Sequence, residues 1–450
     1  MRAFLILLVT VFLTACGDDG DGGGLLPPPT SCGAEDQKQF VYDAMLGWYL
    51  WNDSLPQSVN LSNYATAEDL LDYLVTFRPA TDSQGNPIGR FSFITTTEAD
   101  QQFYGEGRYE GYGFSPVLGA GETDWQIKRV FEDSPSFRAG MERGQRIIAL
   151  DGRSIAEIQA AEGTSAVLDA GTADFTLQNL DGSEFTVTIT EDIVTIDPVP
   201  QWGLIDRPGN SPVGYIELST FIGTANTDPA NFTAAFEAFA NANVNDVILD
   251  LRYNRGGLVS TAELLANYLG GFVAENLLFS STEYNADRAA QSNSQTFFSR
   301  LGNSLALSRL VVIATREDTA SASELVANGL DPHVTVGIVG DRTYGKPVGQ
   351  VAIDFCEKRL RPTSFQTFNA DGFGDYFGGL PADCLADDDL SFAVGDVDND
   401  PNMIAALTWL ETGGCPVAAA PGGEFKVGPE DVAPQPDLSG PPHRELANAY

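Results

Sequence analysis

The chain has 450 residues, of which 43% are hydrophobic and 10% aromatic, enough to form the cores of two or three globular domains. Its 62 acidic residues outnumber its 25 lysines and arginines, which gives a formal net charge of −37. This balance argues against nucleic acid as a partner, because phosphate backbones are bound by clustered Lys and Arg side chains. It suits a soluble surface in an extracytoplasmic or salty environment.

The chain begins with a short apolar segment. Arg2 precedes an apolar run over residues 3–13, which is too short to span a bilayer and predicts a signal peptide over residues 1–15. The run ends in Leu-Thr-Ala-Cys, which resembles the lipobox of bacterial lipoproteins and so implies cleavage before Cys16 and lipidation of that residue. The alternative is a plain secretory signal, but the Gly/Asp-rich stretch that opens the predicted flexible linker, residues 16–32, favours a tether. We therefore expect a protein of the bacterial cell envelope, anchored to a membrane by lipid on the periplasmic side or at the cell surface.

Four cysteines remain if Cys16 is lipidated, and an even number in an exported chain predicts two disulfides. Four cysteines allow three pairings. The predicted pairing joins Cys356 to Cys384 and Cys32 to Cys415, the second bridge tying the two ends of the chain together. The sequence contains no Cys-x-x-Cys motif and no Cys/His cluster, so we expect neither a zinc site nor a cofactor.

The rest of the chain changes pattern in steps. Residues 33–100 contain stretches in which apolar residues recur every three or four positions, typical of helices, and residues 90–95 predict a short strand. Residues 101–195 are predicted to form a domain of Gly-punctuated, alternating strands. In residues 196–415 β-rich runs alternate with helical ones, which predicts an α/β core with strands buried on both faces. The Pro/Gly-rich tail, residues 416–450, is expected to be disordered.

One stretch of the predicted core, residues 309–330, combines a strand, a turn and a helix that begins at Ser321. A serine at such a junction is exposed by the turn, and the free N–H groups of the helix N-terminus favour negative charge nearby. Ser321 and Ser323 are therefore both candidate nucleophiles. The alternative is that one of them only caps the helix, with Glu324 completing a capping box from Ser321. Taken alone, the stretch favours this alternative, because serines before helices are common.

A serine nucleophile needs a base, and the usual base is histidine. The chain has two histidines: His333 lies beside a proline before a predicted strand, and His443 lies in the tail. Neither is well placed, which argues against a His-dependent triad. Lysine can replace histidine if burial lowers its pKa toward neutrality. Lys346, between a glycine and a proline, is the candidate; the alternative is an ordinary solvated lysine in a turn.

A third element follows the predicted buried strand over residues 246–252. Asn254 and Arg255 lead there into the adjacent glycines Gly256 and Gly257. Adjacent glycines let backbone N–H groups approach a ligand closely, which suits one half of an oxyanion hole. The alternative is a simple turn.

Three motifs in this order resemble those of the C-terminal processing (tail-specific) serine peptidases: DLRYNRGG (250–257), TASASE (319–324) and YGKPVGQ (344–350). In that family the nucleophile lies 25 residues before the lysine, which favours Ser321 over Ser323 as the partner of Lys346. The resemblance also implies that Gln350 orients the lysine amine.

The same resemblance implies an oxyanion hole and supporting groups around this dyad. The N–H of Gly256 or Gly257, together with the N–H of Ala322, would bind the oxyanion. Family members carry an acid three residues after the serine and a threonine three before the lysine, which match Glu324 and Thr343.

The resemblance covers about residues 35–412 and is weakest in the N-terminal helices. It implies an α/β multidomain protein with a helical N-terminal region, a PDZ-like β-rich domain and an α/β (crotonase/Clp-like) peptidase core. Two residues depart from the family pattern: Arg255 stands where proline is frequent, and Pro347 where glycine is frequent. These changes would alter loop shape and substrate preference but remove no catalytic group.

Upstream, residues 134–155 are similar to the second half of a PDZ domain. Residues 111–118 would then form the carboxylate-binding loop, with the N–H groups of Gly113 and Phe114 facing a peptide C-terminus. The peptide would add as a strand beside the sheet edge. The alternative is a PDZ-shaped spacer that has lost peptide binding.

Together these observations predict a serine endopeptidase that hydrolyses exported proteins and recognises their C-terminal segments through the PDZ-like domain. Its partners would be protein or peptide substrates and, through the lipid, a membrane. Neutral Lys346 would take the proton from Ser321, which attacks a peptide carbonyl and forms an acyl-enzyme. The rival is a non-catalytic peptide-binding lipoprotein that kept the scaffold; the intact serine, lysine and glutamine weigh against it.

Overall fold

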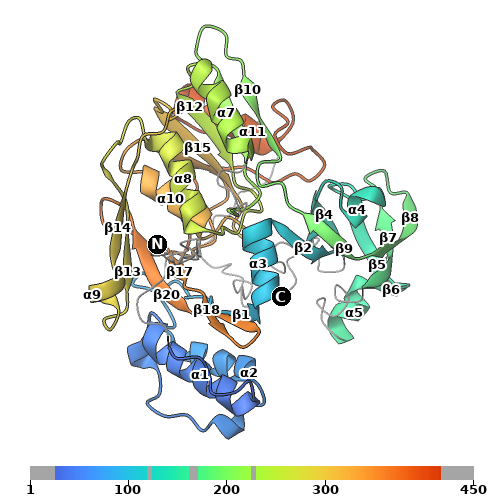
Figure 1. Cartoon of the computed structure of the whole chain (residues 1–450). Helices are drawn as coiled ribbons and strands as arrows, with labels where there is room; N and C mark the ends of the chain where they lie inside the picture. Colours follow the sequence, from blue (N-terminus) through green and yellow to red (C-terminus); the bar gives the residue numbers. More distant parts are fainter. Residues whose placement is uncertain (1–25, 119–123, 162–170, 224–229, 417–450) are drawn as a thin grey trace, which may run out of the picture.

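The computed structural model describes residues 26–118, 124–161, 171–223 and 230–416 (Figure 1). The predicted signal peptide, the lipidation site Cys16 and the Pro/Gly-rich tail lie outside these residues, so they stay predictions. The predicted fold class is confirmed: a helical N-terminal region, a separate β-rich domain and an α/β core are present. No helix in the described ranges is long and apolar enough to cross a membrane.

The N-terminal region is built on two helices, α1 (Ala34–Trp48) and α2 (Ala67–Leu74), at the bottom of Figure 1. Their buried faces pack on strand β18 (Ile353–Phe355), so this region is joined to the core by a shared hydrophobic cluster. The strand predicted at 90–95 is found as β1 (Phe93–Thr96), which pairs antiparallel with β19 (Lys358–Arg361). Three short 3-10 helices complete the region: Asn52–Ser54, Leu61–Asn63 and Val75–Phe77.

Helix α3 (Thr97–Glu106) leads into the β-rich domain, at the right of Figure 1. Its strands run in the order β3-β4-β5-β7-β8, so β3 and β8 are the terminal strands, and β6 pairs with β5. Inward-facing side chains alternate with exposed ones along β7, as the predicted alternation requires. Strands β2 and β9, at the two ends of this domain in the sequence, pair to form a separate two-stranded antiparallel sheet. The elements are β2 (Arg108–Gly111), β3 (Phe114–Leu118), β4 (Trp125–Val130), α4 (Pro135–Arg138), β5 (Arg146–Leu150), β6 (Arg153–Ser154), α5 (Ile155–Ala161), β7 (Thr172–Gln178), β8 (Glu184–Thr190) and β9 (Asp192–Thr195).

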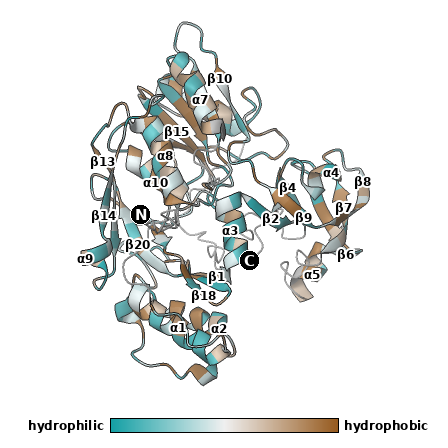
Figure 2. Ribbon diagram, viewed as in Figure 1, coloured by the Kyte–Doolittle hydropathy of each residue, from teal (hydrophilic) through white to brown (hydrophobic). Residues whose placement is uncertain are grey.

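The core is a six-stranded sheet in the order β10-β11-β12-β15-β16-β21, parallel except for β10. Its middle strands are buried on both faces, because alternate side chains pack against helices on opposite sides; β15 is hydrophobic along its length in Figure 2. Helices α7, α8 and α10 cover one face and α11 the other. The elements are β10 (Gln201–Ile205), β11 (Val213–Glu217), α7 (Ala230–Asn241), β12 (Asp246–Asp250), α8 (Val259–Gly270), β15 (Arg309–Ala314), α10 (Ala322–Leu330), β16 (Thr335–Gly340), β21 (Cys384–Leu385) and α11 (Pro401–Thr412).

A second sheet of the core has the strand order β14-β13-β20-β17; β13 and β14 lie between α8 and β15 in the sequence, and β17 and β20 follow β16. The carboxyl ends of parallel β12, β15 and β16 lie at one edge of the main sheet, so the loops that follow them meet there. These three loops carry the three sequence motifs. The remaining elements are β13 (Leu278–Tyr284), α9 (Ala289–Ser292), β14 (Ser294–Phe297), β17 (Val348–Gln350) and β20 (Thr363–Phe368).

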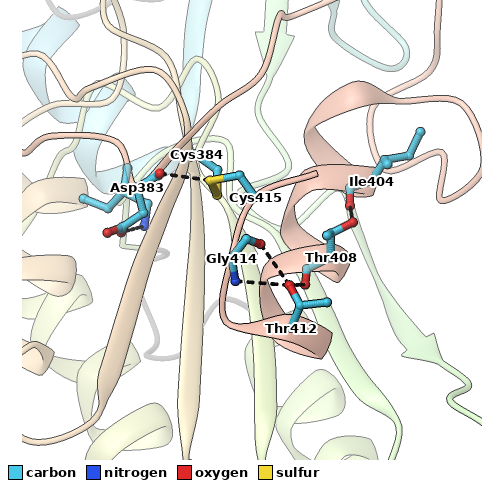
Figure 3. Close-up of a disulfide and its surroundings, with 8 residues drawn as sticks. Asp383, Cys384, Ile404, Thr408, Thr412, Gly414 and Cys415 are labelled. Atoms are coloured by element: carbon cyan, nitrogen blue, oxygen red, sulfur yellow. Dashed lines mark hydrogen bonds between the residues drawn. A yellow bond between two sulfur atoms is a disulfide. The ribbon is translucent and has the colours of Figure 1, made fainter. Parts of the chain in front are cut away.

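Two disulfides are present among the described residues, but the predicted pairing is wrong. Cys32 pairs with Cys356, and Cys384 pairs with Cys415 (Figure 3). Cys32 stands just before α1, which packs on β18, and Cys356 lies in the turn after β18. Helix α11 runs back along β15, β16 and β21, which returns the chain at Cys415 to Cys384. The pairing follows from helix packing that cysteine spacing does not reveal.

Candidate active site

Ser321 lies at the junction of the turn after β15 and helix α10, and the predicted strand–turn–helix arrangement is confirmed. Its backbone has φ +55° and ψ −112°, a conformation that residues other than glycine rarely adopt. Such strain costs roughly 1–3 kcal/mol and is concentrated at functional sites. The turn is held in place by the Thr319 hydroxyl, which donates to the Leu251 carbonyl at 3.0 Å. The fold therefore fixes Ser321 in a conformation that helix capping alone does not require.

Ser323, the second candidate nucleophile, uses its hydroxyl in a hydrogen bond to the backbone. Ser323 is fully buried, and its hydroxyl donates to the Asn254 carbonyl at 2.9 Å. A hydroxyl engaged in a buried hydrogen bond is poorly placed to attack a substrate. Of the two serines, the geometry favours Ser321 as the nucleophile.

The Glu324 carboxylate links the serine and lysine segments. One oxygen, Oε2, accepts the N–H of Ser321 at 2.9 Å and the N–H of Lys346 at 2.8 Å. The other accepts the N–H of Gly345 at 2.7 Å and the Thr343 hydroxyl. The backbone nitrogens of Ser321 and Lys346 therefore lie within two hydrogen-bond lengths of each other. Burial raises the pKa of Glu324 to about 7, although the four hydrogen bonds act to lower it.

We expect Glu324→Gln to change how stability depends on pH. The pKa of Glu324 lies above its ordinary value of 4.5, so the wild-type protein loses this carboxyl's contribution to stability as the pH rises from 4.5 to about 7. The unfolding free energy of the wild type should therefore fall relative to that of the variant by about 3 kcal/mol across this window. Urea unfolding of both proteins between pH 4.5 and 8 measures the difference; a constant difference would contradict the expectation.

Lys346 is buried, with 5% of its surface exposed, so the alternative of a solvated turn lysine is wrong. Its Nζ lies 5.7 Å from the centre of the Phe91 ring. The Gln350 amide donates to the Phe91 carbonyl at 2.7 Å, so the side chains of Gln350 and Lys346 both contact Phe91. Around them lies an apolar cluster to which the N-terminal region contributes, formed by Ile88, Phe91, Ala320, Tyr344, Val348 and Phe377, with Leu50 and Trp51 packed against it.

Phe91 carries no sequence signal of this contact, because its position in a predicted strand does not indicate that it lies beside the lysine amine. The described histidine, His333, lies at the far end of α10 from Ser321. Its Nε2 bonds the Leu278 carbonyl at 2.8 Å, and its ring packs on Phe298. His333 therefore takes no part in this site.

The glycine pair after β12 lies against the serine. Gly256 and Gly257 have φ of +100° and +137°, and a Cβ on Gly256 would lie 2.8 Å from the Ser321 Cβ and 2.9 Å from the Ala322 nitrogen. The Gly256 N–H donates to the Asn254 side-chain oxygen at 2.9 Å, so it is already used. Ala322 is the first residue of α10, and its N–H has no acceptor within the helix. Of the two predicted combinations, the geometry favours Gly257 with Ala322.

Asn254 organises this part of the site, a role that the sequence analysis did not assign to it. Its Nδ2 donates to the Leu218 carbonyl at 2.8 Å, and its carbonyl accepts the Ala320 N–H at 3.2 Å as well as the Ser323 hydroxyl. It is fully buried. The sequence feature that could have indicated this role is the position of Asn254, a polar residue between a buried strand and a pair of glycines.

The loop predicted over residues 111–118 is shorter than expected, because Gly111 ends β2 and Phe114–Leu118 form β3, which leaves only Tyr112 and Gly113 between the two strands. Gly113 has φ +86°, and a Cβ there would lie 2.1 Å from the Ser134 Cβ, so only glycine fits. The Gly113 carbonyl accepts the N–H of Phe131 at 2.9 Å and the Ser134 hydroxyl at 3.1 Å. Phe114 begins β3 with a buried side chain. The binding of a peptide C-terminus by Gly113 and Phe114 stays a prediction.

Comparisons with known proteins agree on one family. Residues 212–373 match the model described as peptidase family S41, and residues 36–93 match the peptidase S41 N-terminal domain. The chain is 26% identical over 317 residues to a carboxyl-terminal-processing protease of Synechocystis sp., an alignment that covers 69% of this chain and 70% of that relative. It is 30% identical over 235 residues to the chloroplastic carboxyl-terminal-processing peptidase 3 of Arabidopsis thaliana, covering 49% of this chain and 42% of that relative.

Among solved structures, a Bacteroides fragilis protein described as an S41 protease superposes with a TM-score of 0.64 at 24% sequence identity. The match covers 83% of this chain and 97% of that one, which shows that the two share a fold.

Proposed function

This chain belongs to peptidase family S41, and we propose that it is a serine endopeptidase with Ser321 as nucleophile and Lys346 as general base. The observation that carries the proposal is the Glu324 carboxylate, whose Oε2 accepts the backbone N–H of both residues. A nucleophile and its base must be held within reach of each other, and Glu324 does this for the two segments that present them.

In the proposed mechanism the neutral amine of Lys346 takes the proton from the Ser321 hydroxyl, whose oxygen attacks a peptide carbonyl. The N–H groups of Gly257 and Ala322 stabilise the oxyanion that forms. The lysine ammonium then donates its proton to the leaving amine, and water hydrolyses the acyl-enzyme. Burial among Phe91 and its apolar neighbours favours the neutral amine, because a desolvated ammonium is unstable.

Substrate recognition is proposed to begin at the β-rich domain. A peptide C-terminus would bind at the N–H groups of Gly113 and Phe114, and the peptide would add as a strand beside β3, one of the two terminal strands of its sheet. The substrates would be proteins of the cell envelope, to which the predicted lipid on Cys16 would anchor the enzyme. The rival, a non-catalytic binding lipoprotein, gives no reason to keep a lysine buried at a free energy cost beside a strained serine.

Digestion of an unfolded protein tests the proposal. Purified protein incubated with unfolded β-casein is expected to cut internal peptide bonds, with products identified by mass spectrometry. The rate should be unchanged by EDTA, because the proposed dyad uses no metal. Absence of cleavage would favour the binding lipoprotein, and stepwise removal of residues from one end would contradict the endopeptidase assignment.

A further inference from the structure

One buried carboxylate beside the active site holds two cationic side chains. The Asp318 Oδ2 accepts Lys128 Nζ at 2.7 Å, and Oδ1 accepts Arg255 Nη2 at 2.8 Å and Nε at 2.9 Å. All three side chains are at most 5% exposed. Lys128 and Arg255 lower the pKa of Asp318 to about 2 although burial raises it, so this carboxyl is charged. We call Lys128, Asp318 and Arg255 the interdomain triad.

The interdomain triad touches both chain segments of the proposed oxyanion hole. Arg255 directly precedes the Gly256–Gly257 pair, and Asp318 lies three residues before Ser321. The same two segments are joined by a backbone hydrogen bond of 3.2 Å from the Ala320 N–H to the Asn254 carbonyl. The ion pair between Arg255 and Asp318 therefore links the segment that carries Gly257 to the segment that carries Ala322.

Lys128 comes from a different domain. It lies in β4 of the β-rich domain, and its Nζ also lies 5.2 Å from the centre of the Tyr253 ring, two residues before Arg255. Burying a charged lysine is unfavourable unless the charge is paired with an opposite one. Burial lowers the pKa of Lys128, and the negative charge of Asp318 opposes that shift. The β-rich domain thus supplies a buried lysine that contacts both the serine loop, at Asp318, and the glycine loop, at Tyr253.

The ion pair between Arg255 and Asp318 restrains the backbone that leads into Gly256 and Gly257. Because Lys128 and Arg255 bond the same carboxylate, removing Lys128 changes how Asp318 holds Arg255.

From these contacts we infer that Lys128 is a positioning residue for the oxyanion hole, acting on Gly257 and Ala322 through Asp318 and Arg255. The inference rests on the proposed function. Peptidase activity therefore depends on a cation from the β-rich domain, even for a substrate too short to bind there. The transition state, rather than the bound substrate, is what this cation stabilises.

The test compares neighbouring lysine and arginine residues in one strand. Lys128→Met is expected to lower kcat on a short fluorogenic peptide, chosen from the casein cleavage sites, by about tenfold or more, with KM little changed. Lys128→Arg keeps the cation and should recover kcat to within about threefold of wild type. Arg129→Met is the matched control: like Lys128, Arg129 lies over the Tyr253 ring, at 5.5 Å from its centre, and makes a buried ion pair with the core, but its partner is Glu217 at the end of β11 rather than Asp318. It should keep kcat within about twofold of wild type.

A wild-type kcat in folded Lys128→Met would overturn the inference. So would an equal fall in Arg129→Met, which would show that domain docking in general is responsible. If Lys128→Met does not fold, as judged by thermal unfolding, Arg255→Met replaces it, and a wild-type kcat in that variant overturns the inference equally. Failure of the proposed function shows in another measurement, namely casein cleavage by Ser321→Ala at the wild-type rate.

Discussion

Ser321→Ala is expected to lower casein cleavage by at least about 10,000-fold, the loss found when a catalytic serine is removed from a serine peptidase. Alanine keeps the backbone of the turn and the hydrogen bond from the residue 321 N–H to Glu324, which involves no side-chain atom of residue 321. The variant should therefore fold normally and bind substrate, and only the attack on the carbonyl is lost. Initial rates of casein cleavage, with thermal unfolding to check the fold, measure the effect.

Ser323→Ala is the matched control, because it removes a hydroxyl from the same turn of the same helix. The Ser323 hydroxyl donates to the Asn254 carbonyl, which also accepts the Ala320 N–H, so that carbonyl keeps one donor in the variant. We expect a loss of about 1 kcal/mol in stability and less than about a tenfold loss in rate. Retained activity in Ser321→Ala with loss of activity in Ser323→Ala would reverse the assignment of the two serines.

The sequence predicted the parts of the site that depend on local pattern. The glycine pair was predicted to follow a buried strand, and it does follow β12. That this loop meets the loops after β15 and β16 at one edge of the sheet is known from the structure. The strand–turn–helix junction at Ser321 was also predicted. Its backbone strain was not, because a φ of +55° at a serine follows from surrounding contacts rather than from its own preference.

The parts that depend on packing between distant segments were not predicted. Phe91 reaches Lys346 because the N-terminal region packs on the core, and no local pattern records that contact. The choice between Gly256 and Gly257 depends on one side-chain hydrogen bond from Asn254. The disulfides were mispaired for the same reason. Lys128 and Asp318 are far apart in the sequence, so their ion pair became visible only in the structure.

Lys346→Met is expected to be as inactive as Ser321→Ala, with at least about a 10,000-fold loss of kcat/KM. Methionine matches the length and apolar stem of lysine, so it can occupy the buried position of Lys346 beside Phe91. The backbone N–H of residue 346 still bonds Glu324, so the turn keeps its position. What is removed is the amine that accepts the serine proton, and without it the hydroxyl is a weak nucleophile.

Lys346→Arg separates a base from a structural cation at the same position. Arginine keeps a positive charge but is not deprotonated in proteins, so it cannot accept a proton from Ser321. If Lys346 acts as the general base, Lys346→Arg stays inactive at every pH at which the protein is folded. If the lysine only supplies a charge to the site, arginine should restore a measurable part of the rate. Casein cleavage by both variants between pH 6 and 10, beside wild type, decides between these roles, and activity in Lys346→Arg would contradict the proposed dyad.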